Sequence, residues 1–544
     1  MKLIHYTRAD FLGNLKGNIF GGITAGIVAL PLALAFGIAS GAGPVAGLYG
    51  AIILGFFAAI FGGTPSQISG PTGPMTVVMT AVIAKFMAQH PDQGMALAFT
   101  TVVLGGVLQA LMGVFRLGRY IVMVPYPVIS GFMTGIGVII IFLQLPVLIG
   151  VPSSGGVLGA LNQFVTHLPQ MQSDAVLVGL ASLGVIFLWR GRFAHWLPAP
   201  LLALIVGTLL ISLINPNSPI DRIGEIPSAL PHFQWPTFTL DVLPDMLANA
   251  AMLAILGSID SLLTSLVADN ITGTRHDSDR ELIGQGIGNT LAGLFGGLPG
   301  AGATMRTVVN VRAGGTGPLS GVIHALLLLA VALGLGFMFE GIPQAVLAGI
   351  LVKVGIDIID WPFLKRFHRL PAFTVFLTLL VLVLTVFVDL MTAVFIGVFI
   401  KNLVTLDKLS DLELGSVIIS DGEHLDERLP QNEQQWLSSQ GSASLLIRIT
   451  GPISYAVGRR LLQRTEQFKG HRNVIIDLTS ASLIGISTAM ILEEIINKAK
   501  ANGANVFLLG VHGKTKEELN KIGLLELVGI SNIYDDLAGL QAHL

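Results

Sequence analysis

The sequence predicts a polytopic α-helical membrane protein that ends in a small soluble α/β domain. The chain has 544 residues, of which 52% are hydrophobic and only 12% are charged, and its mean hydropathy is +0.75. Soluble domains carry about 25% charged residues, so most of this chain must face lipid or other apolar helices. Charged residues become frequent only where the long apolar segments stop. We therefore expect a membrane domain over 1–406, an acidic linker over 407–442 and a soluble domain over 443–544.

Apolar segments fill the membrane domain and are separated by short loops. Twelve of them approach the roughly 20 residues that a helix needs to cross a bilayer. They are 18–40, 44–62, 97–115, 127–149, 174–189, 198–214, 246–268, 283–298, 318–339, 343–360, 371–388 and 390–406. Two shorter segments, 75–89 and 304–311, each follow a stretch that is rich in glycine and proline. Together they make fourteen segments, an even number that places both ends of the domain on one side.

The positions of the basic residues orient this topology. If the N-terminus is cytoplasmic, the cytoplasmic loops receive most of the Lys and Arg residues, including Arg116, Arg190 and Arg275. The opposite loops receive Arg222 and little else. Cytoplasmic loops of membrane proteins carry an excess of Lys and Arg. The sequence therefore predicts a multi-pass protein whose N-terminus and soluble domain are cytoplasmic.

The two short segments occupy the third and tenth places, seven apart. The stretches that contain them also resemble each other, Pro-Thr-Gly-Pro-Met-Thr-Val-Val at 71–78 and Ala-Gly-Ala-Thr-Met-Arg-Thr-Val-Val at 301–309. With seven segments in each half, the second half starts on the opposite side of the membrane, which makes a 7+7 inverted repeat. Interrupted segments in corresponding positions of two such halves mark the substrate site of a transporter.

An acidic residue, Asp260, lies inside one of the apolar segments. Acids at bilayer depth are energetically unfavourable and usually serve an ion or a proton pathway. Thr264 follows four residues later and shares its helix face. A carboxylate, a hydroxyl and the free carbonyls of an interrupted segment are hard oxygen ligands that suit Na⁺. Three alternatives remain: proton coupling through Asp260 alone, a protonated Asp260 that caps a neighbouring helix, and a structural pair with Arg306.

The two interrupted segments also predict an anion site. A helix that begins inside the membrane points unpaired backbone N–H groups and a partial positive charge at its surroundings. Such groups occur near Met75–Thr76 and near Thr304–Met305, and nearby hydroxyls can assist them. Arg306 either supplies a fixed positive charge here or anchors the cytoplasmic side. The candidate substrate-binding residues are Ser69, Thr72, Met75, Thr76, Ala303, Thr304 and Arg306.

The soluble domain alternates short apolar strands with helical stretches. The expected strands are 445–450, 473–478 and 505–509, and a helix is expected over 487–501. Strands that alternate with helices indicate an α/β domain.

Several classes of function are disfavoured by composition. The net charge of −2 indicates no nucleic-acid partner. The chain contains no cysteine, which excludes disulfides and thiolate metal sites. The 12 histidines show no metal-ligand spacing, and no nucleophile stands with a base, so we expect no enzymatic activity.

Several of these stretches resemble the SulP/SLC26 anion transporter family. They are 125–132, 260–264, 269–275, 280–289 and 296–302. The C-terminal domain is similar to a STAS domain, and the resemblance covers nearly the whole chain. It implies a UraA/SLC26-like fold, in which a core domain moves against a gate domain by alternating access. It also implies a homodimer with cytoplasmic STAS domains.

Within that family the chain most resembles sodium-dependent bicarbonate transporters. That resemblance implies a bacterial plasma (inner) membrane protein in contact with lipid, with Na⁺ as its coupling ion and bicarbonate as its substrate. It assigns Ser69 to the anion site. The residues that it assigns to the sodium site are Asp260, Thr264, Gly302, Ala303 and Thr304. The remaining alternatives are a sulfate or dicarboxylate carrier, coupled to protons or sodium, an uncoupled anion channel and a membrane-tethered signalling protein.

Overall fold

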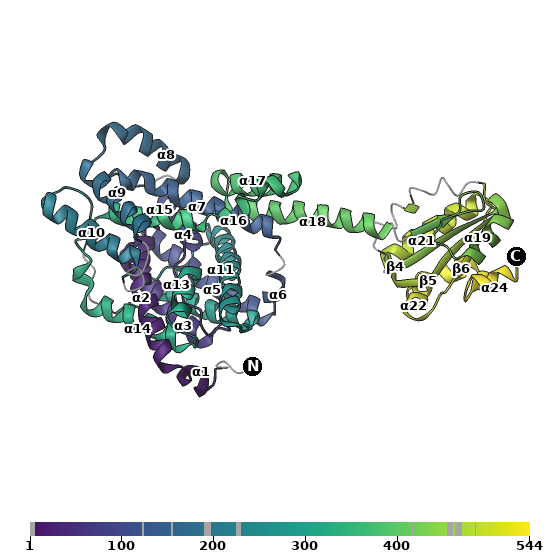
Figure 1. The fold of residues 1–544 in the computed structure, drawn as a ribbon, viewed down its shortest axis with the longest axis horizontal. Coiled ribbons are helices and arrows are strands. Elements are labelled where there is room, and N and C mark those ends of the chain that lie inside the picture. The colour runs from purple at the N-terminus through teal and green to yellow at the C-terminus, as the bar shows by residue number, and fades with distance from the viewer. Residues whose placement is uncertain are drawn as a thin grey trace. The chain divides into compact units, whose positions relative to one another are not determined.

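The fold is that of a computed structural model, which consists of two compact units, Met1–Val398 and Phe399–Leu544. The structure describes residues 6–121, 124–153, 156–189, 197–224, 230–414, 417–453, 461–462, 470–484 and 486–544. The first unit is helical, and the second builds an α/β sheet (Figure 1).

Each of the fourteen predicted segments lies on a helix of the structure, in the predicted order. The helices are α1 (Arg8–Leu12), α2 (Leu15–Ala39), α3 (Pro44–Phe61), α4 (Gly73–Gln89), α5 (Gly94–Val114), α6 (Gly118–Ile121), α7 (Tyr126–Leu148), α8 (Gly156–His167), α9 (Ser173–Leu188), α10 (Ala199–Ile214), α11 (Leu243–Thr272), α12 (Ser278–Leu294), α13 (Thr304–Arg312), α14 (Leu319–Gly334), α15 (Gln344–Ile358), α16 (Trp361–Leu364), α17 (Ala372–Phe387) and α18 (Leu390–Leu414). Helix α8 was not predicted from the sequence.

Five of the described helices, α2, α3, α5, α7 and α11, are long and apolar enough to cross a membrane alone. Helices α10, α14 and α17 are apolar but shorter, and the pair formed by α8 and α9 bends by 120°. The fourteen crossings and the inverted repeat therefore stay predictions.

Proline and glycine mark the ends of these helices. Proline occupies the first turn of α3, α4, α7, α10 and α11, where its missing N–H needs no partner. Helix α11 runs for 30 residues and stops at Gly273, whose φ of 70° is a left-handed conformation that favours glycine. The long α11 therefore ends in a turn that leads directly into α12.

The helical unit contains two groups of packed helices. In the first, α12 packs on α3 and α5, α11 packs on α5 and α13, and α14 packs on α2 and α3. In the second, α7 packs on α15 and α17, and α9 packs on α10 and α15. Fewer contacts, such as those of α2 with α15 and of α4 with α7, join the groups. This division fits the core and gate domains that the resemblance implies.

Glycine lets the helices of the first group approach closely. A Cβ atom at Gly286 of α12 would lie 2.3 Å from the backbone nitrogen of Ala110 in α5. A side chain cannot fit there, so α5 and α12 touch through their backbones, as small residues allow in membrane helices.

The second unit is built on a five-stranded sheet with the order β3-β4-β5-β6-β7. Its strands are β3 (Val417–Ser420), β4 (Ser444–Ile453), β5 (Asn473–Ile484), β6 (Asn505–Leu509) and β7 (Ile533–Tyr534). Only β3 pairs antiparallel, and the later strands pair parallel. The three predicted strands are thus confirmed as β4, β5 and β6, and the predicted helix is confirmed as α21 (Ile486–Ala501).

Alternate residues of the strands build two separate apolar cores. Leu445 and Ile447 belong to a core that includes residues of α21, α22 (Gly513–Lys521) and α23 (Leu524–Val528). Leu446 between them belongs to the core that includes residues of α19 (Gln431–Gln440) and α24 (Leu537–Gln541). Successive strand residues point to opposite faces, so helices cover both sides of the sheet.

The segment that we expected to be an acidic linker, 407–442, contains folded elements. Strand β3 pairs with β4, and Ile418 and Leu437 are buried in the smaller core. A hydrogen bond from the Arg428 side chain lowers the pKa of Asp426 to about 2. Pattern analysis missed β3 because four residues are too few for a periodic signal among so many charges.

Candidate substrate and cation site

The two interrupted segments meet in the interior of the helical unit. Strand β1 (Ser69–Gly70) pairs antiparallel with β2 (Ala301–Gly302), with Ser69 opposite Gly302. Helix α4 begins three residues after β1, and α13 begins two residues after β2. The N-termini of both helices therefore flank one short ladder. The first-turn N–H groups of an α-helix have no intrahelical acceptor, so both ends carry partial positive charge.

Helix α11 passes beside this ladder and carries Asp260 and Thr264. The Thr264 hydroxyl donates to the Gly302 carbonyl at 2.9 Å and lies 2.7 Å from the Thr304 hydroxyl. One turn earlier, the Ser261 hydroxyl accepts a hydrogen bond from the Gly302 N–H at 3.1 Å. The N–H and the carbonyl of Gly302 are thus both hydrogen-bonded to side chains of α11. Thr264, Gly302 and Thr304, which the family resemblance assigned to one cation site, lie in contact.

The Asp260 carboxyl group is buried and incompletely paired. Its side chain faces the Thr72 hydroxyl and the Arg306 guanidinium. Among the described residues, neither Asp260 Oδ2 nor Thr72 Oγ1 has a hydrogen-bond partner. No ion pair within 4.0 Å joins Asp260 to Arg306, both of which the structure describes. Asp260 thus faces both groups without a direct ion pair to Arg306, and its role as a cation ligand, helix cap or partner of Arg306 stays a prediction.

The groups of the candidate cation site, Asp260 and the cluster of Thr264, Gly302 and Thr304, are ligands that suit a monovalent hard cation. One carboxyl oxygen without a partner, two hydroxyls and one backbone carbonyl provide oxygen ligands with a single acidic group. An unpaired buried carboxylate is strongly unfavourable, so a cation that binds here would relieve its desolvation. The described residues contain no group of three or more His, Asp or Glu side chains that could hold a metal ion. Ala303 has no side-chain ligand, and its N–H donates to the Ile68 carbonyl at 2.8 Å.

Arg306 lies in the interior beside the end of β1, not at the cytoplasmic surface. Its side chain is 2% exposed, and Nη2 donates to the Pro71 carbonyl at 2.6 Å. Nη1 has no hydrogen-bond partner among the described residues. A Cβ atom at Gly70 would lie 2.6 Å from Nη1, so glycine leaves the space that the guanidinium occupies. Of our two interpretations of Arg306, this position favours the fixed positive charge.

The other candidate anion residues are held by the protein in different ways. The Ser69 hydroxyl accepts a hydrogen bond from the Gln285 Nε2 atom at 2.6 Å. The Thr76 N–H and hydroxyl both donate to the Thr72 carbonyl, at 2.9 and 2.8 Å. This differs from our expectation that the Thr76 N–H faces the anion, because one helical turn suffices to satisfy it. Met75 is buried and its terminal methyl faces Gly257 of α11.

Sequence analysis missed a row of polar side chains on α12. Glu281, Gln285 and Asn289 are all buried. Asn289 exchanges two hydrogen bonds with the Gly300 backbone, which precedes β2. Gln285 donates to both Ser69 and Glu281. The spacing of four residues places all three on one helix face and was the available signal. Through these hydrogen bonds the row holds Ser69 of β1 and Gly300, the residue before β2, against α12.

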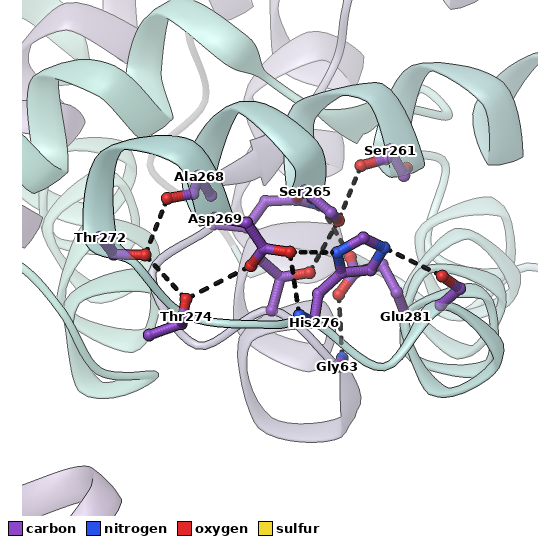
Figure 2. Close-up of polar contacts among 12 residues, drawn as sticks. Gly63, Ser261, Ser265, Ala268, Asp269, Thr272, Thr274, His276 and Glu281 are labelled. Carbon is purple, nitrogen blue, oxygen red and sulfur yellow. Dashed lines mark hydrogen bonds and ion pairs between the residues drawn. The ribbon is translucent and has the colours of Figure 1, made fainter. Parts of the chain in front are cut away.

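The turn between α11 and α12 is closed by a second polar cluster (Figure 2). The Asp269 carboxylate lies 2.7 Å from His276 Nδ1 and accepts the His276 backbone N–H at 3.1 Å. His276 Nε2 in turn lies 2.9 Å from the Ser278 hydroxyl, at the start of α12. Glu281, one turn further on, accepts the Gly63 N–H at 2.9 Å. The contacts of His276 join the end of α11 to the start of α12, and Glu281 joins α12 to the loop that precedes β1.

Comparison with known families identifies this arrangement. Residues 15–381 match the model of the sulfate permease family, and residues 437–539 match the model of the STAS domain. The chain belongs to the sulfate permease family.

Several relatives of this sulfate permease family member span most of its length. It is 47% identical over 497 residues to the bicarbonate transporter BicA of a Synechocystis species, covering 91% of this chain and 88% of that protein. It is 44% identical to BicA of a Picosynechococcus species, covering 89% and 87%. Among solved structures, the transmembrane domain of a cyanobacterial BicA superposes with a TM-score of 0.69 at 51% identity, covering 72% of this chain and 100% of that one.

A more distant structure shows the same fold over the whole chain. The murine Solute Carrier 26 family member A9 in its inward-facing state gives a TM-score of 0.81 at 18% identity, covering 99% of this chain and 92% of that one. The family resemblance and the fold class predicted from the sequence are therefore confirmed: a helical membrane transporter core followed by a STAS domain. The expectation of a transporter rather than an enzyme is confirmed by the same relatives.

Proposed function

We propose that this sulfate permease family member takes up bicarbonate together with Na⁺ by alternating access. The two relatives named bicarbonate transporters cover about nine-tenths of the chain. The observation that carries the coupling is the buried Asp260 carboxyl, which has an unpartnered oxygen and lies one turn from Thr264. A cation bound to that carboxyl would lie beside the β1–β2 ladder, and both half-helices begin shortly after this ladder.

Coupling arises because the cation and the anion would share one site. With no cation, the Asp260 charge repels an anion that approaches the N-termini of α4 and α13. A bound Na⁺, held by Asp260, Thr264, Thr304 and the Gly302 carbonyl, cancels that charge. The two half-helix dipoles and Arg306 then attract the anion. Movement of the first helix group against the second, with both ions or neither bound, would carry them across together.

The same charges favour a small, singly charged anion. One guanidinium and one Na⁺ face a single carboxylate, a net charge of +1 in full charges that matches a monovalent anion, and the two half-helix N-termini add only partial charges. Uncompensated charge at the bilayer centre is strongly unfavourable. Bicarbonate also donates one hydrogen bond, which the Ser69 hydroxyl or a free backbone carbonyl can accept. The candidate contacts are Ser69, Thr72, Met75, Thr76, Ala303, Thr304 and Arg306.

Competition in reconstituted vesicles tests the substrate. Labelled bicarbonate uptake should rise with an inward Na⁺ gradient at fixed pH and membrane potential. Excess unlabelled bicarbonate should suppress it, and equal concentrations of sulfate or succinate should not. Labelled sulfate uptake at a comparable rate would contradict the bicarbonate assignment. Uptake that follows a pH gradient and ignores Na⁺ would indicate proton coupling, and flux without any coupling would indicate a channel.

The STAS domain is proposed to support a homodimer from the cytoplasmic side without contacting substrate. It has two apolar cores of its own, as a separately folding domain does. Deleting residues 415–544 leaves α18 whole and should reduce the dimer fraction in light-scattering measurements. The order of anion preference should stay that of the full chain. A changed preference in the truncated protein would show that the domain acts on the substrate path.

A further inference from the structure

A large cavity separates the two helix groups of the transport unit. It measures about 820 Å³ and is lined by residues of α2, α4 and α11 on one side and of α7 and α15 on the other. In the predicted topology, the residues at its wide end, such as Lys85 and Asp245, face the outside. The cavity is therefore an outer vestibule, large enough to hold a hydrated anion.

Helix α4 lines both the vestibule and a smaller cavity next to it. The smaller cavity is lined by Gly73 and Thr76, which belong to the first turns of that helix. The two cavities share six residues in their walls: Ala39, Val77, Thr80, Leu143, Gln144 and Leu351. The two cavities therefore adjoin along α4 and α7, and the smaller one reaches the first turns of α4, which belong to the candidate anion site.

Gln144 of α7 lies where the vestibule and the narrow cavity join. Its side chain is 6% exposed, and its amide makes no hydrogen bond to the residues that the structure describes. The two hydroxyls nearby are occupied, because Thr80 donates to the Thr76 and Ala39 carbonyls and Thr76 donates to Thr72. With no partner among the described residues, the Gln144 amide is left to bind a molecule inside the cavities that it lines. Packing therefore does not explain a glutamine at this position.

The amide has the hydrogen-bonding capacity that a protonated monovalent oxyanion needs. Its NH₂ group donates to the charged oxygens, and its carbonyl accepts from the O–H of bicarbonate. Sulfate, nitrate and chloride have no O–H at neutral pH, so they leave the carbonyl of a buried amide facing a negative ion. A site that expects a hydrogen-bond donor rejects an analogue without one more strongly than a hydrophobic pocket does.

We infer that Gln144 is a specificity-determining residue of the gate-side helix α7, which binds the O–H and charged oxygens of bicarbonate in the outer vestibule before the anion reaches α4. This inference rests on the proposed function, and it assigns a role to a residue outside the two interrupted segments. Because the proposed contact lies on the outer side, it should change the affinity for external bicarbonate and leave Na⁺ binding unchanged.

The test is a comparison of Gln144→Met with the full-length wild type in sealed, oriented proteoliposomes. Gln144→Met keeps the length of the side chain and removes both polar groups. The external KM for bicarbonate should rise about tenfold, with Vmax and the Na⁺ dependence changed by less than about twofold. Nitrate, which is planar and monovalent but has no O–H, should become a stronger competitor in the same variant.

Two further variants separate a specific role from a general disturbance. Gln344 also lines the vestibule, but its amide donates to the Arg222 carbonyl. Gln344→Met should leave the bicarbonate KM and the nitrate competition unchanged. Gln144→Glu keeps the shape of the side chain and replaces the donor by an acceptor, and it should reduce bicarbonate entry more than Gln144→Met.

The outcomes of this experiment distinguish the two proposals. Absence of bicarbonate transport by the wild type would reject the proposed function, whatever Gln144 does to the anion that is transported. An unchanged bicarbonate KM and unchanged nitrate competition in folded Gln144→Met protein would overturn the inference and leave sodium-coupled bicarbonate uptake intact. Equal KM changes in Gln144→Met and Gln344→Met would also overturn it.

Discussion

Replacing Asp260 by asparagine should abolish sodium-stimulated bicarbonate uptake while the protein still folds. The substitution keeps the shape of the side chain and removes the negative charge that offsets the desolvation of a bound cation. It also removes a buried carboxyl oxygen that has no partner, so folding does not depend on it. Initial rates in vesicles with an imposed Na⁺ gradient should fall at least about a hundredfold, which corresponds to about 2.7 kcal/mol.

Two companion variants sharpen this prediction. Thr264→Val deletes one ligand oxygen and should raise the Na⁺ concentration for half-maximal uptake while activity persists. Asp241→Asn removes a carboxylate whose side chain is 58% exposed, just before the same helix, and should leave uptake unchanged. Normal sodium stimulation in folded Asp260→Asn protein would refute the assignment of the cation site.

Replacing Glu281 by methionine should destabilise the transport unit by about 3–5 kcal/mol, because it leaves several buried donors without an acceptor. The Glu281 carboxyl accepts hydrogen bonds from the Gly63 N–H, Gln67 and Gln285 at 2.7–2.9 Å. The side chain is 1% exposed, so water cannot replace these contacts. The measurement is the thermal unfolding midpoint of the detergent-purified protein, together with the yield of monodisperse material.

Glu281→Gln provides a graded control. Its carbonyl can still accept from the two glutamines, but its NH₂ group would face the Gly63 N–H, so its loss should be smaller than that of Glu281→Met. Asp92→Asn, at an exposed position, should not change the unfolding midpoint. Equal midpoints for Glu281→Met and wild type would show that the network behind the ladder contributes nothing to stability.

The residues of the candidate cation site stand out in the sequence because their signals are local. An acid such as Asp260 within an apolar segment stands out against its neighbours, and Thr264 follows at helical spacing. The interruptions before α4 and α13 stand out for the same reason, since glycine and proline break apolar runs. The strands β4, β5 and β6 were also predicted, because short apolar runs between charged helices are easily recognised.

The supporting residues could not be predicted in the same way. Gln285 and Asn289 are polar residues in a glycine-rich stretch, and nothing in the local sequence says which groups they bind. Their partners, Ser69 and Gly300, lie 216 and 11 residues away. Gln144 is likewise an ordinary glutamine until a cavity is known to pass it.

The local sequence was enough to predict a membrane protein of apolar helices, two interrupted segments and one acid inside an apolar segment. Those properties follow from hydropathy and local backbone preference, which each segment carries by itself. Only the tertiary structure decided that Ser69 lies opposite Gly302, that Thr264 reaches Gly302 and Thr304, and that Arg306 points inward. Such contacts join residues that are distant in the chain, and they depend on the register and the close approach of packed helices, which no single segment specifies.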